Sequence, residues 1–316
     1  MFSAGKNKIS RRSFIGSVGA ASACSGLGVV SSAEARGAGS GCKRATAFAL
    51  VGDRFHNSDY IRSALGKTLV REAGLSIDFT NEVTVLNSEN LRNYRMLIVF
   101  RDAVVWPMGY GPNHWWGGYH IRPDNVDSVK CVKQDWYPGY KKLPPLEIVS
   151  VPPVPDYQAK PVCWMTEEQG LAVKKFVEGG GAAFFYHNAP YIATENRYFR
   201  EVLGASTMQH PPIRPFKVKV VNPNHPIMRG GNDFIITDEQ HFAKYNADPS
   251  AILARSVNED GLAHRDHGLT AEASWAFDYG KGRVCYMSPG HTIDALWNPE
   301  YEKMQRNAVR WLLREI

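Results

Sequence analysis

Short runs made almost entirely of apolar residues recur along the chain, and stretches with helical periodicity separate them. The clearest runs are residues 45–51, 96–100 and 182–186. A strand that is apolar at every position is buried on both faces, as in a parallel sheet covered by helices. Between two runs, residues 60–73 repeat apolar side chains every three or four positions, which is typical of a helix. The pattern predicts an α/β fold with a mostly parallel sheet and helices on both faces.

The second half of the chain extends this pattern. Thr166 and Gln169 are spaced as a capping box, and the helix that they begin should end at the glycines 179–181. These glycines follow a helix and precede a strand, the reverse of a phosphate-binding loop, so they indicate a helix end. Further strands are expected at residues 75–79, 216–221, 234–238, 251–255, 274–277 and 283–288, and further helices at 88–91 and 299–313.

Residues 104–164 interrupt the pattern with a long insertion that has no clear period. The insertion holds five of the eight tryptophans, and a segment of this length without regular structure is usually functional. Indole rings offer flat apolar faces that suit stacking on the C–H faces of a sugar. The rings either line the mouth of a pocket or form a small core of the insertion. We expect substrate contacts from Trp106, Trp115 and Trp116.

The first 35 residues have the pattern of an export signal. Arg11 and Arg12 form a twin-arginine motif before a mildly apolar stretch, and Ala33 and Ala35 mark a cleavage site. A membrane anchor is disfavoured because Gly and Ser interrupt the stretch, which is short for a span of about 20 apolar residues. The sequence predicts a cleaved twin-arginine signal peptide and a periplasmic or otherwise exported protein. A linker at 36–44 and one domain at 45–316 follow, with no later membrane span.

Charge and cysteine content exclude some function classes. The chain has 37 basic and 31 acidic residues. Four of the basic and one of the acidic residues lie in the first 35 positions, so the mature chain carries about +3. No basic stripe is present, which argues against a nucleic-acid partner. The mature cysteines, Cys42, Cys131, Cys163 and Cys285, include no C-x-x-C pair. Cys131 and Cys163 are either a disulfide or two free thiols.

Three histidines stand where expected strands end. His56 follows the first strand, His187 follows the strand at 182–186, and His291 follows the last strand. Glu239 follows the strand at 234–238. Ligands of open α/β sheets bind beyond the carboxyl ends of the strands, so we expect these four side chains to share one site.

Several segments in order resemble one known family. They are residues 53–56, 166–189, 223–227, 237–240 and 275–291. Together they are similar to the ThuA-like (trehalose utilisation) family, whose fold is that of class I glutamine amidotransferases, with a flavodoxin-like sheet. The resemblance implies a role in sugar metabolism, associated with trehalose and oxidised (3-keto) disaccharides. This chain departs from the family in its long insertion and in having His241-Phe242 where a tyrosine is more usual.

The residue at the turn after strand 182–186 bears on the chemistry. A related amidotransferase carries its nucleophilic cysteine there, whereas this chain has His187, and a G-x-S-x-G motif is absent. Two mechanisms remain. In the first, His187 and Glu239 act as base and acid on a sugar, with a ketone making the neighbouring proton acidic. In the second, His56, His187, Glu239 and His291 bind a divalent metal such as Zn, Mn or Fe.

These patterns predict an exported enzyme with a small-molecule sugar substrate. The expected substrate is a disaccharide or 3-keto glycoside, and the expected reaction is isomerisation, elimination or hydrolysis. Catalytic roles are expected for His56, His187, Glu239 and His291, and Asp53 and Asn188 are expected to bind the substrate. The alternatives are a non-catalytic carbohydrate-binding protein and an interaction module.

Overall fold

A computed structural model describes residues 45–105 and 162–316 of the chain. The predicted signal peptide and linker lie outside the described residues. So do Cys42, Cys131 and most of the insertion, including Trp106, Trp115 and Trp116. The disulfide between Cys131 and Cys163 therefore stays a prediction.

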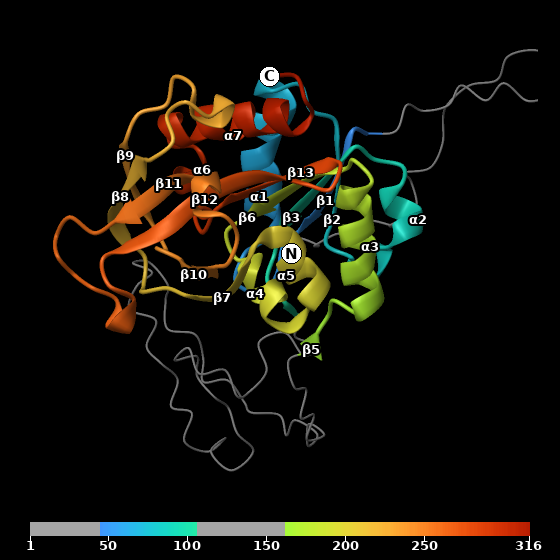
Figure 1. Ribbon diagram of the computed structural model, residues 1–316, viewed down its shortest axis with the longest axis horizontal. Helices are drawn as coiled ribbons and strands as arrows, with labels where there is room; N and C mark the ends of the chain where they lie inside the picture. Colours follow the sequence, from blue (N-terminus) through green and yellow to red (C-terminus); the bar gives the residue numbers. More distant parts are fainter. Residues whose placement is uncertain (1–44, 106–161) are drawn as a thin grey trace, which may run out of the picture. The chain divides into compact units, whose positions relative to one another are not determined.

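A nine-stranded mixed sheet is the centre of the fold (Figure 1). Its order is β2-β1-β3-β6-β13-β12-β11-β8-β9. The strands from β2 to β13 are parallel, and those from β13 to β9 alternate in direction. The parallel part contains β1 (Ala47–Val51), β2 (Ile77–Thr80), β3 (Met96–Phe100), β6 (Ala182–Tyr186) and β13 (Gly282–Met287). The antiparallel part contains β8 (Arg214–Val220), β9 (Phe234–Asp238), β11 (Ile252–Val257) and β12 (Thr270–Tyr279).

Burial explains why the two parts of the sheet differ in sequence pattern. Every residue of β1, β3 and β6 is buried, since helices cover both faces of the parallel part. Residues of β9 alternate between buried and exposed, as in a strand with one face toward water. The predicted α/β class is confirmed, and the antiparallel extension makes the sheet mixed.

Helices pack on both faces of the sheet and bury two separate apolar cores (Figure 1). One core includes residues of α1 (Ser58–Leu65), the π-helical η1 (Gly66–Glu72), α6 (Ile293–Leu296) and α7 (Pro299–Leu312). The other includes residues of α2 (Ser88–Leu91), α3 (Glu167–Glu178), α4 (Pro190–Glu195) and α5 (Arg197–Leu203). Short 3-10 turns are η2 (Val83–Val85), η4 (Pro226–Met228), η5 (Pro249–Ala251) and η6 (Arg265–His267).

Local signals place some of these helices as expected. Thr166 caps α3 through the backbone N–H of Gln169, whose side chain accepts from the N–H of Thr166, so the predicted capping box is confirmed. The helix expected at 60–73 is present as α1 followed by a π-helical stretch. None of the helices within 45–105 and 162–316 meets the length and apolarity that a bilayer span requires.

Two small two-stranded sheets complete the described fold. In one, β7 (Ala205–Gln209) pairs with β10 (Phe242–Tyr245). In the other, β4 (Val104–Val105) pairs with β5 (Val162–Cys163), so the two ends of the insertion lie side by side. Trp164 is buried next to this pair and donates its indole N–H to the carbonyl of Asp102 at 2.7 Å.

Candidate functional site

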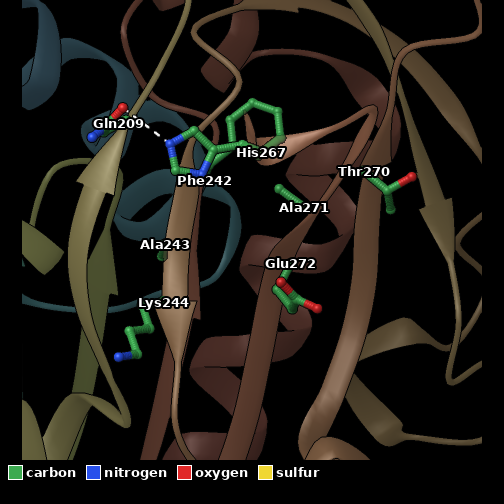
Figure 2. Close-up of a pocket in the computed structure, with 8 residues that line it drawn as sticks. All are labelled: Gln209, Phe242, Ala243, Lys244, His267, Thr270, Ala271 and Glu272. Atoms are coloured by element: carbon green, nitrogen blue, oxygen red, sulfur yellow. Dashed lines mark hydrogen bonds between the residues drawn. The ribbon is translucent and has the colours of Figure 1, made fainter. Parts of the chain in front are cut away.

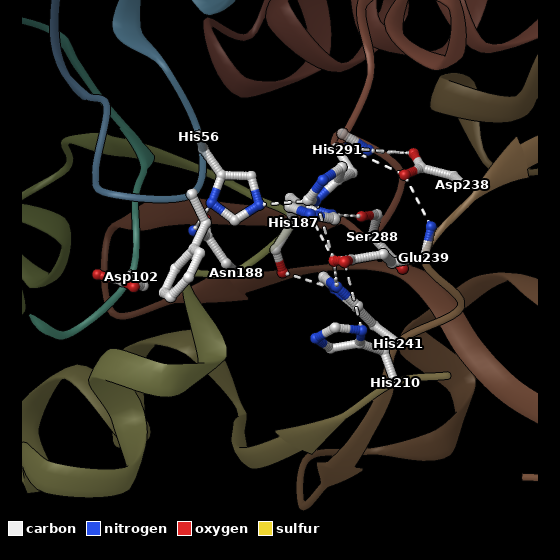
Figure 3. Close-up of polar contacts among 12 residues, drawn as sticks. His56, Asp102, His187, Asn188, His210, Asp238, Glu239, His241, Ser288 and His291 are labelled. Atoms are coloured by element: carbon white, nitrogen blue, oxygen red, sulfur yellow. Dashed lines mark hydrogen bonds and ion pairs between the residues drawn. The ribbon is translucent and has the colours of Figure 1, made fainter. Parts of the chain in front are cut away.

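Four loops bring histidine and carboxylate side chains to one edge of the sheet (Figure 3). His56 follows β1, His187 follows β6, Glu239 follows β9, and His291 follows β13. β9 belongs to the antiparallel part, but it runs in the same direction as β13. Four successive antiparallel pairings, β9-β8, β8-β11, β11-β12 and β12-β13, separate the two strands, and an even number of reversals restores the direction. The carboxyl end of β9 therefore lies at the same edge of the sheet as the carboxyl ends of the parallel strands, where α/β sheets bind their ligands.

Asp53 holds His56 from behind. The Nδ1 atom of His56 lies 2.9 and 3.1 Å from the two carboxylate oxygens of Asp53. Because a carboxylate only accepts, this contact puts a proton on Nδ1. The Asp53 side chain is fully buried, and it also accepts from the Asn188 amide and from the backbone N–H groups of Phe55, His56 and Asp102. The other ring nitrogen of His56, Nε2, lies 3.1 Å from Nδ1 of His291.

His187 occupies a strained position at the sharp turn after β6. Its φ is 45°, in the left-handed region that non-glycine residues seldom adopt. The Nδ1 atom lies 2.8 Å from the carbonyl oxygen of Ser288 and therefore donates to it. The Nε2 atom is buried and has no hydrogen-bond partner among the described residues. It faces Oε2 of Glu239 at 3.4 Å.

Glu239 is the centre of the arrangement. Its Oε2 atom lies 3.4 Å from Nε2 of His187, 3.4 Å from Nε2 of His241 and 3.1 Å from Nδ1 of His291. Its Oε1 atom lies 3.5 Å from Nδ1 of His210. We call the five histidines His56, His187, His210, His241 and His291, together with Glu239, the histidine cluster.

Asp238 fixes the backbone that carries His291. Its buried carboxylate accepts from the N–H of Gly290 at 2.6 Å and from the N–H of His291 at 3.0 Å. Tyr301 donates its hydroxyl to the carbonyl of the preceding residue, Pro289, at 2.8 Å. The turn after β13 is thus bonded from both sides, which sets the place of the His291 ring.

Gly290 is required by close packing in this turn. A Cβ atom at position 290 would lie 2.7 Å from Cβ of His187 and 2.7 Å from Cζ of Phe100. We expect Gly290→Ala to lower the free energy of unfolding by about 1–3 kcal/mol, because overpacking forces neighbours to move. Urea denaturation measures this loss. Gly66→Ala is the matched control, since a Cβ there meets nothing within 4 Å; an equal loss in both variants would contradict the packing argument.

The electrostatic state of the cluster follows from burial and from its contacts. Burial lowers the pKa of His187 well below the usual value, and that of His241 to about 4, so both rings are neutral at pH 7. Burial alone would raise the pKa of Glu239, but the surrounding imidazoles outweigh it and hold the pKa below the usual range; among them His291, whose own pKa is raised, is the ring that carries the compensating charge. Burial works against a charge on His291 too, yet its contact with Glu239 leaves the His291 pKa raised.

Exposure separates the cluster into a buried and an accessible side. The side chains of His187 and His241 are at most 1% exposed, whereas those of His291 and Glu239 are 24% and 11% exposed. A ligand therefore approaches from the side of His291 and Glu239.

The structure brings together the four residues that the sequence placed at strand ends. One ligand atom from each of His56, His187, Glu239 and His291 lies within 4.8 Å of the others. Asp53 and Asn188 are present as well, but their side chains are buried and bonded to each other. Their position favours holding His56 in place over the substrate contact expected from the sequence. The tryptophans expected to bind substrate lie outside the described residues.

Two members of the cluster were not expected from the sequence. His241 lies two residues after Glu239, on the way into β10, and donates from Nδ1 to the carbonyl of His187 at 3.1 Å. His210 follows β7, the partner of β10. The spacing of His241 from Glu239 was a usable signal, but His210 reaches the cluster only through the pairing of β7 with β10.

A thiol nucleophile is disfavoured for the described part of the chain. Cys285 is fully buried within β13, and burial raises the pKa of its thiol. Cys163 is exposed in β5, which pairs with β4 and does not belong to the nine-stranded sheet. The turn after β6 presents the imidazole of His187, as its sequence position indicated.

A separate pocket of about 390 Å³ lies between β10 and β12 (Figure 2). Gln209 and His267 join across it through a 3.0 Å hydrogen bond. None of the residues that line it belongs to the histidine cluster. Proton transfer or metal binding requires imidazole and carboxylate groups that point toward one another. The histidine cluster has such groups and this pocket does not, so we place the candidate active site in the cluster.

The family of the chain follows from its comparison with known proteins. A family model described as ThuA, trehalose utilisation, matches residues 157–312, which include four of the five cluster histidines and Glu239. Over this part the chain is ThuA-like. This agrees with the resemblance seen in the sequence, and the family description supports a carbohydrate-related role for the ThuA-like chain.

Solved structures agree with the ThuA-like fold. A ThuA-like protein from Parabacteroides merdae aligns with a TM-score of 0.56 at 12% identity, over 86% of this chain and 91% of that one. A ThuA-like protein from Bacteroides uniformis aligns with a TM-score of 0.52 at 14% identity, over 84% and 90%. At such identities the likeness shows the fold alone. A search among curated proteins finds no match for the ThuA-like chain.

Proposed function

We propose that this ThuA-like protein is an exported enzyme that acts on a disaccharide or 3-keto glycoside at the histidine cluster. The family description, trehalose utilisation, supports the sugar substrate, and the twin-arginine segment at the N-terminus supports export. The observation that carries the proposal is the convergence of four loops on one partly accessible carboxylate, Glu239.

A 3-keto glycoside suits this site because its ketone makes the hydrogens on the two neighbouring carbons removable by a base. The carbon between the ketone and the glycosidic carbon carries a hydrogen that a base removes, and the electron pair moves onto the ketone oxygen. When that pair returns, the bond from the glycosidic carbon to oxygen breaks. The leaving oxygen takes a proton and departs as the second sugar, and the first sugar is left as an unsaturated ketone. Addition of water to that ketone completes a hydrolysis, and reprotonation without cleavage is an isomerisation.

The geometry of the cluster argues against direct proton transfer between His187 and the substrate. A substrate does not reach Nε2 of His187, which is buried. Glu239 is ionised, so it does not serve as the acid. The partly exposed His291 and Glu239 are the members positioned to meet the ketone and its neighbouring carbon. The buried rings act on the substrate through Glu239, by setting its place and charge.

The proposal is tested with the mature chain recovered from the periplasm and a panel of disaccharides and their 3-keto derivatives. We expect conversion of a 3-keto glycoside, with solvent deuterium incorporated beside the ketone. His291→Ala should lower kcat by about 100-fold or more, within the range for loss of a group acting in proton transfer. His225→Ala is the control, because His225 accepts from the backbone N–H of Ile227 and packs on Trp311.

Two outcomes would contradict the proposal. Saturable binding of a sugar without conversion or deuterium exchange would identify a carbohydrate-binding protein instead. Equal loss of activity in His291→Ala and His225→Ala would show that the effect comes from stability and that the cluster is not the site.

A further inference from the structure

We propose that His56, His187, His291 and Glu239 bind one divalent transition-metal ion. The inference deepens the proposed function and rests on it for the catalytic meaning of the ion, whereas metal binding itself is measured without any sugar. Three imidazoles and one carboxylate form a donor set that suits Zn²⁺, Fe²⁺ or Mn²⁺.

The first argument is the conflict between bare acceptors in the centre of the site. The Nδ1 proton of His187 goes to the carbonyl of Ser288, so Nε2 of the neutral ring carries a lone pair. That lone pair faces Oε2 of Glu239, which is an acceptor as well. His241 repeats the pattern, since its Nδ1 donates to the carbonyl of His187 and its Nε2 faces the same oxygen. Buried acceptors that face each other repel, and a bound cation removes the repulsion.

The second argument is the set of groups that orient the rings. Metal-bound histidines usually donate their second ring nitrogen to a carboxylate or a backbone carbonyl, which fixes the ring and its tautomer. His56 donates to the carboxylate of Asp53, and His187 donates to the carbonyl of Ser288. In both rings the nitrogen left free is the one that lies near Glu239 and His291.

The third argument is the spacing of the ligand atoms. Metal–ligand bonds of about 2.0–2.1 Å in a tetrahedron put neighbouring ligand atoms about 3.3 Å apart. The observed separations are 3.4 Å from His187 Nε2 to Glu239 Oε2, 3.1 Å from His291 Nδ1 to the same oxygen, and 3.1 Å from His56 Nε2 to His291 Nδ1. Three of the six pairs of ligand atoms are thus near the spacing that a metal requires, and all four atoms lie within 4.8 Å of one another.

Accessibility indicates a catalytic type of metal site. His56 and His187 are buried, while His291 and Glu239 are partly exposed. Within residues 45–105 and 162–316, the exposed side of the cluster is that of His291 and Glu239, and an ion held by the four side chains would meet a sugar oxygen or water there. A divalent metal in that place supplies Lewis-acid polarisation of a ketone oxygen or activation of water.

The test uses the intact mature chain, purified without chelators and analysed for metal by mass spectrometry. After the metal is removed with a chelator, Zn²⁺, Fe²⁺ and Mn²⁺ salts are titrated separately by calorimetry, with folding monitored by circular dichroism. We expect one equivalent of one of these ions to bind. His187→Ala and His56→Ala should weaken its binding by at least about 100-fold, and His225→Ala should bind like the wild type. His291→Ala, at a partly exposed position, replaces either variant if it does not fold.

The outcomes separate this inference from the proposed function. A folded wild-type chain that binds none of the three ions saturably overturns the metal site, as do ligand variants with wild-type affinity. Sugar conversion that persists in the metal-free chain overturns the catalytic role of the ion and leaves the proposed function intact. Metal binding without conversion of any sugar supports the metal site and contradicts the proposed function.

Discussion

Replacing Glu239 by glutamine is expected to reduce sugar conversion by at least about 100-fold without lowering the melting temperature. We base this expected loss on the proposed metal site. Removing a residue that only supports a metal ligand costs about 10- to 100-fold in activity, so removing a ligand itself should cost at least as much. Glutamine has nearly the same shape but no charge, and its amide is able to donate to one of the imidazole nitrogens that now face Oε2. Function is lost while a repulsive contact with His187 and His241 is relieved, and the loss of the contact between the carboxylate and His291 offsets that relief, so the melting temperature should stay near that of the wild type.

The measurements are steady-state kinetics on the converted sugar and thermal unfolding monitored by circular dichroism. Glu89→Gln is the matched control, because the Glu89 side chain is 82% exposed and its one ion pair within the described part of the chain is with Arg92 in the same turn. A Glu239→Gln variant that unfolds well below the wild type would indicate that Glu239 is a structural residue.

Replacing Asp53 by alanine is expected to have the opposite balance, with a large loss of stability. The buried carboxylate accepts from three backbone N–H groups, the Asn188 amide and the His56 ring. Without it these donors lose their acceptor, and each buried donor left unpaired costs about 1–3 kcal/mol. The His56 ring loses its orientation as well, so activity should fall in the fraction that remains folded.

Urea denaturation of Asp53→Ala measures this loss. Asp59→Ala is the control, because that side chain is 85% exposed and lies 3.9 Å from Arg62; it should change stability by no more than about 0.5 kcal/mol. Similar curves for the two variants would show that water satisfies the donors around position 53.

The residues of the cluster that the sequence revealed are those that follow strongly patterned strands. The run at 182–186 is apolar throughout, and β6 has these bounds in the structure, so His187 falls at the strand end. β9 likewise has its predicted bounds, and its alternation between buried and exposed residues is a local pattern that places Glu239 at its end. Such positions are predictable because a buried strand shows as a continuous or alternating run of apolar residues in the local sequence.

Residues that reach the cluster through distant pairings were not predictable in this way. β10 is four residues long, and it is fixed by pairing of Phe242 with Gln209. That pairing brings in His210, whose own neighbourhood shows no strand period. Asn188 bonds to Asp53 from 135 positions away, and no local pattern reports such a contact.

Short helices between 190 and 203 were missed although they carry local signals. Pro190 lies in the first turn of α4, Asn196 caps α5 through the N–H of Phe199, and Gly204 ends α5 with a left-handed φ of 76°. The two helices have six and seven residues, too few for a period of 3.6 to stand out. Capping residues are thus a better guide than periodicity for helices of this length.

The contact between His56 and His291 joins residues 235 positions apart. Bringing together residues so far apart in the chain costs conformational entropy, and the contacts of the completed sheet offset that cost. We therefore expect the arrangement around Glu239 to form late in folding, once β1 and β13 are both in place. A nascent or truncated chain lacks it altogether, so its appearance is a marker of the finished native state.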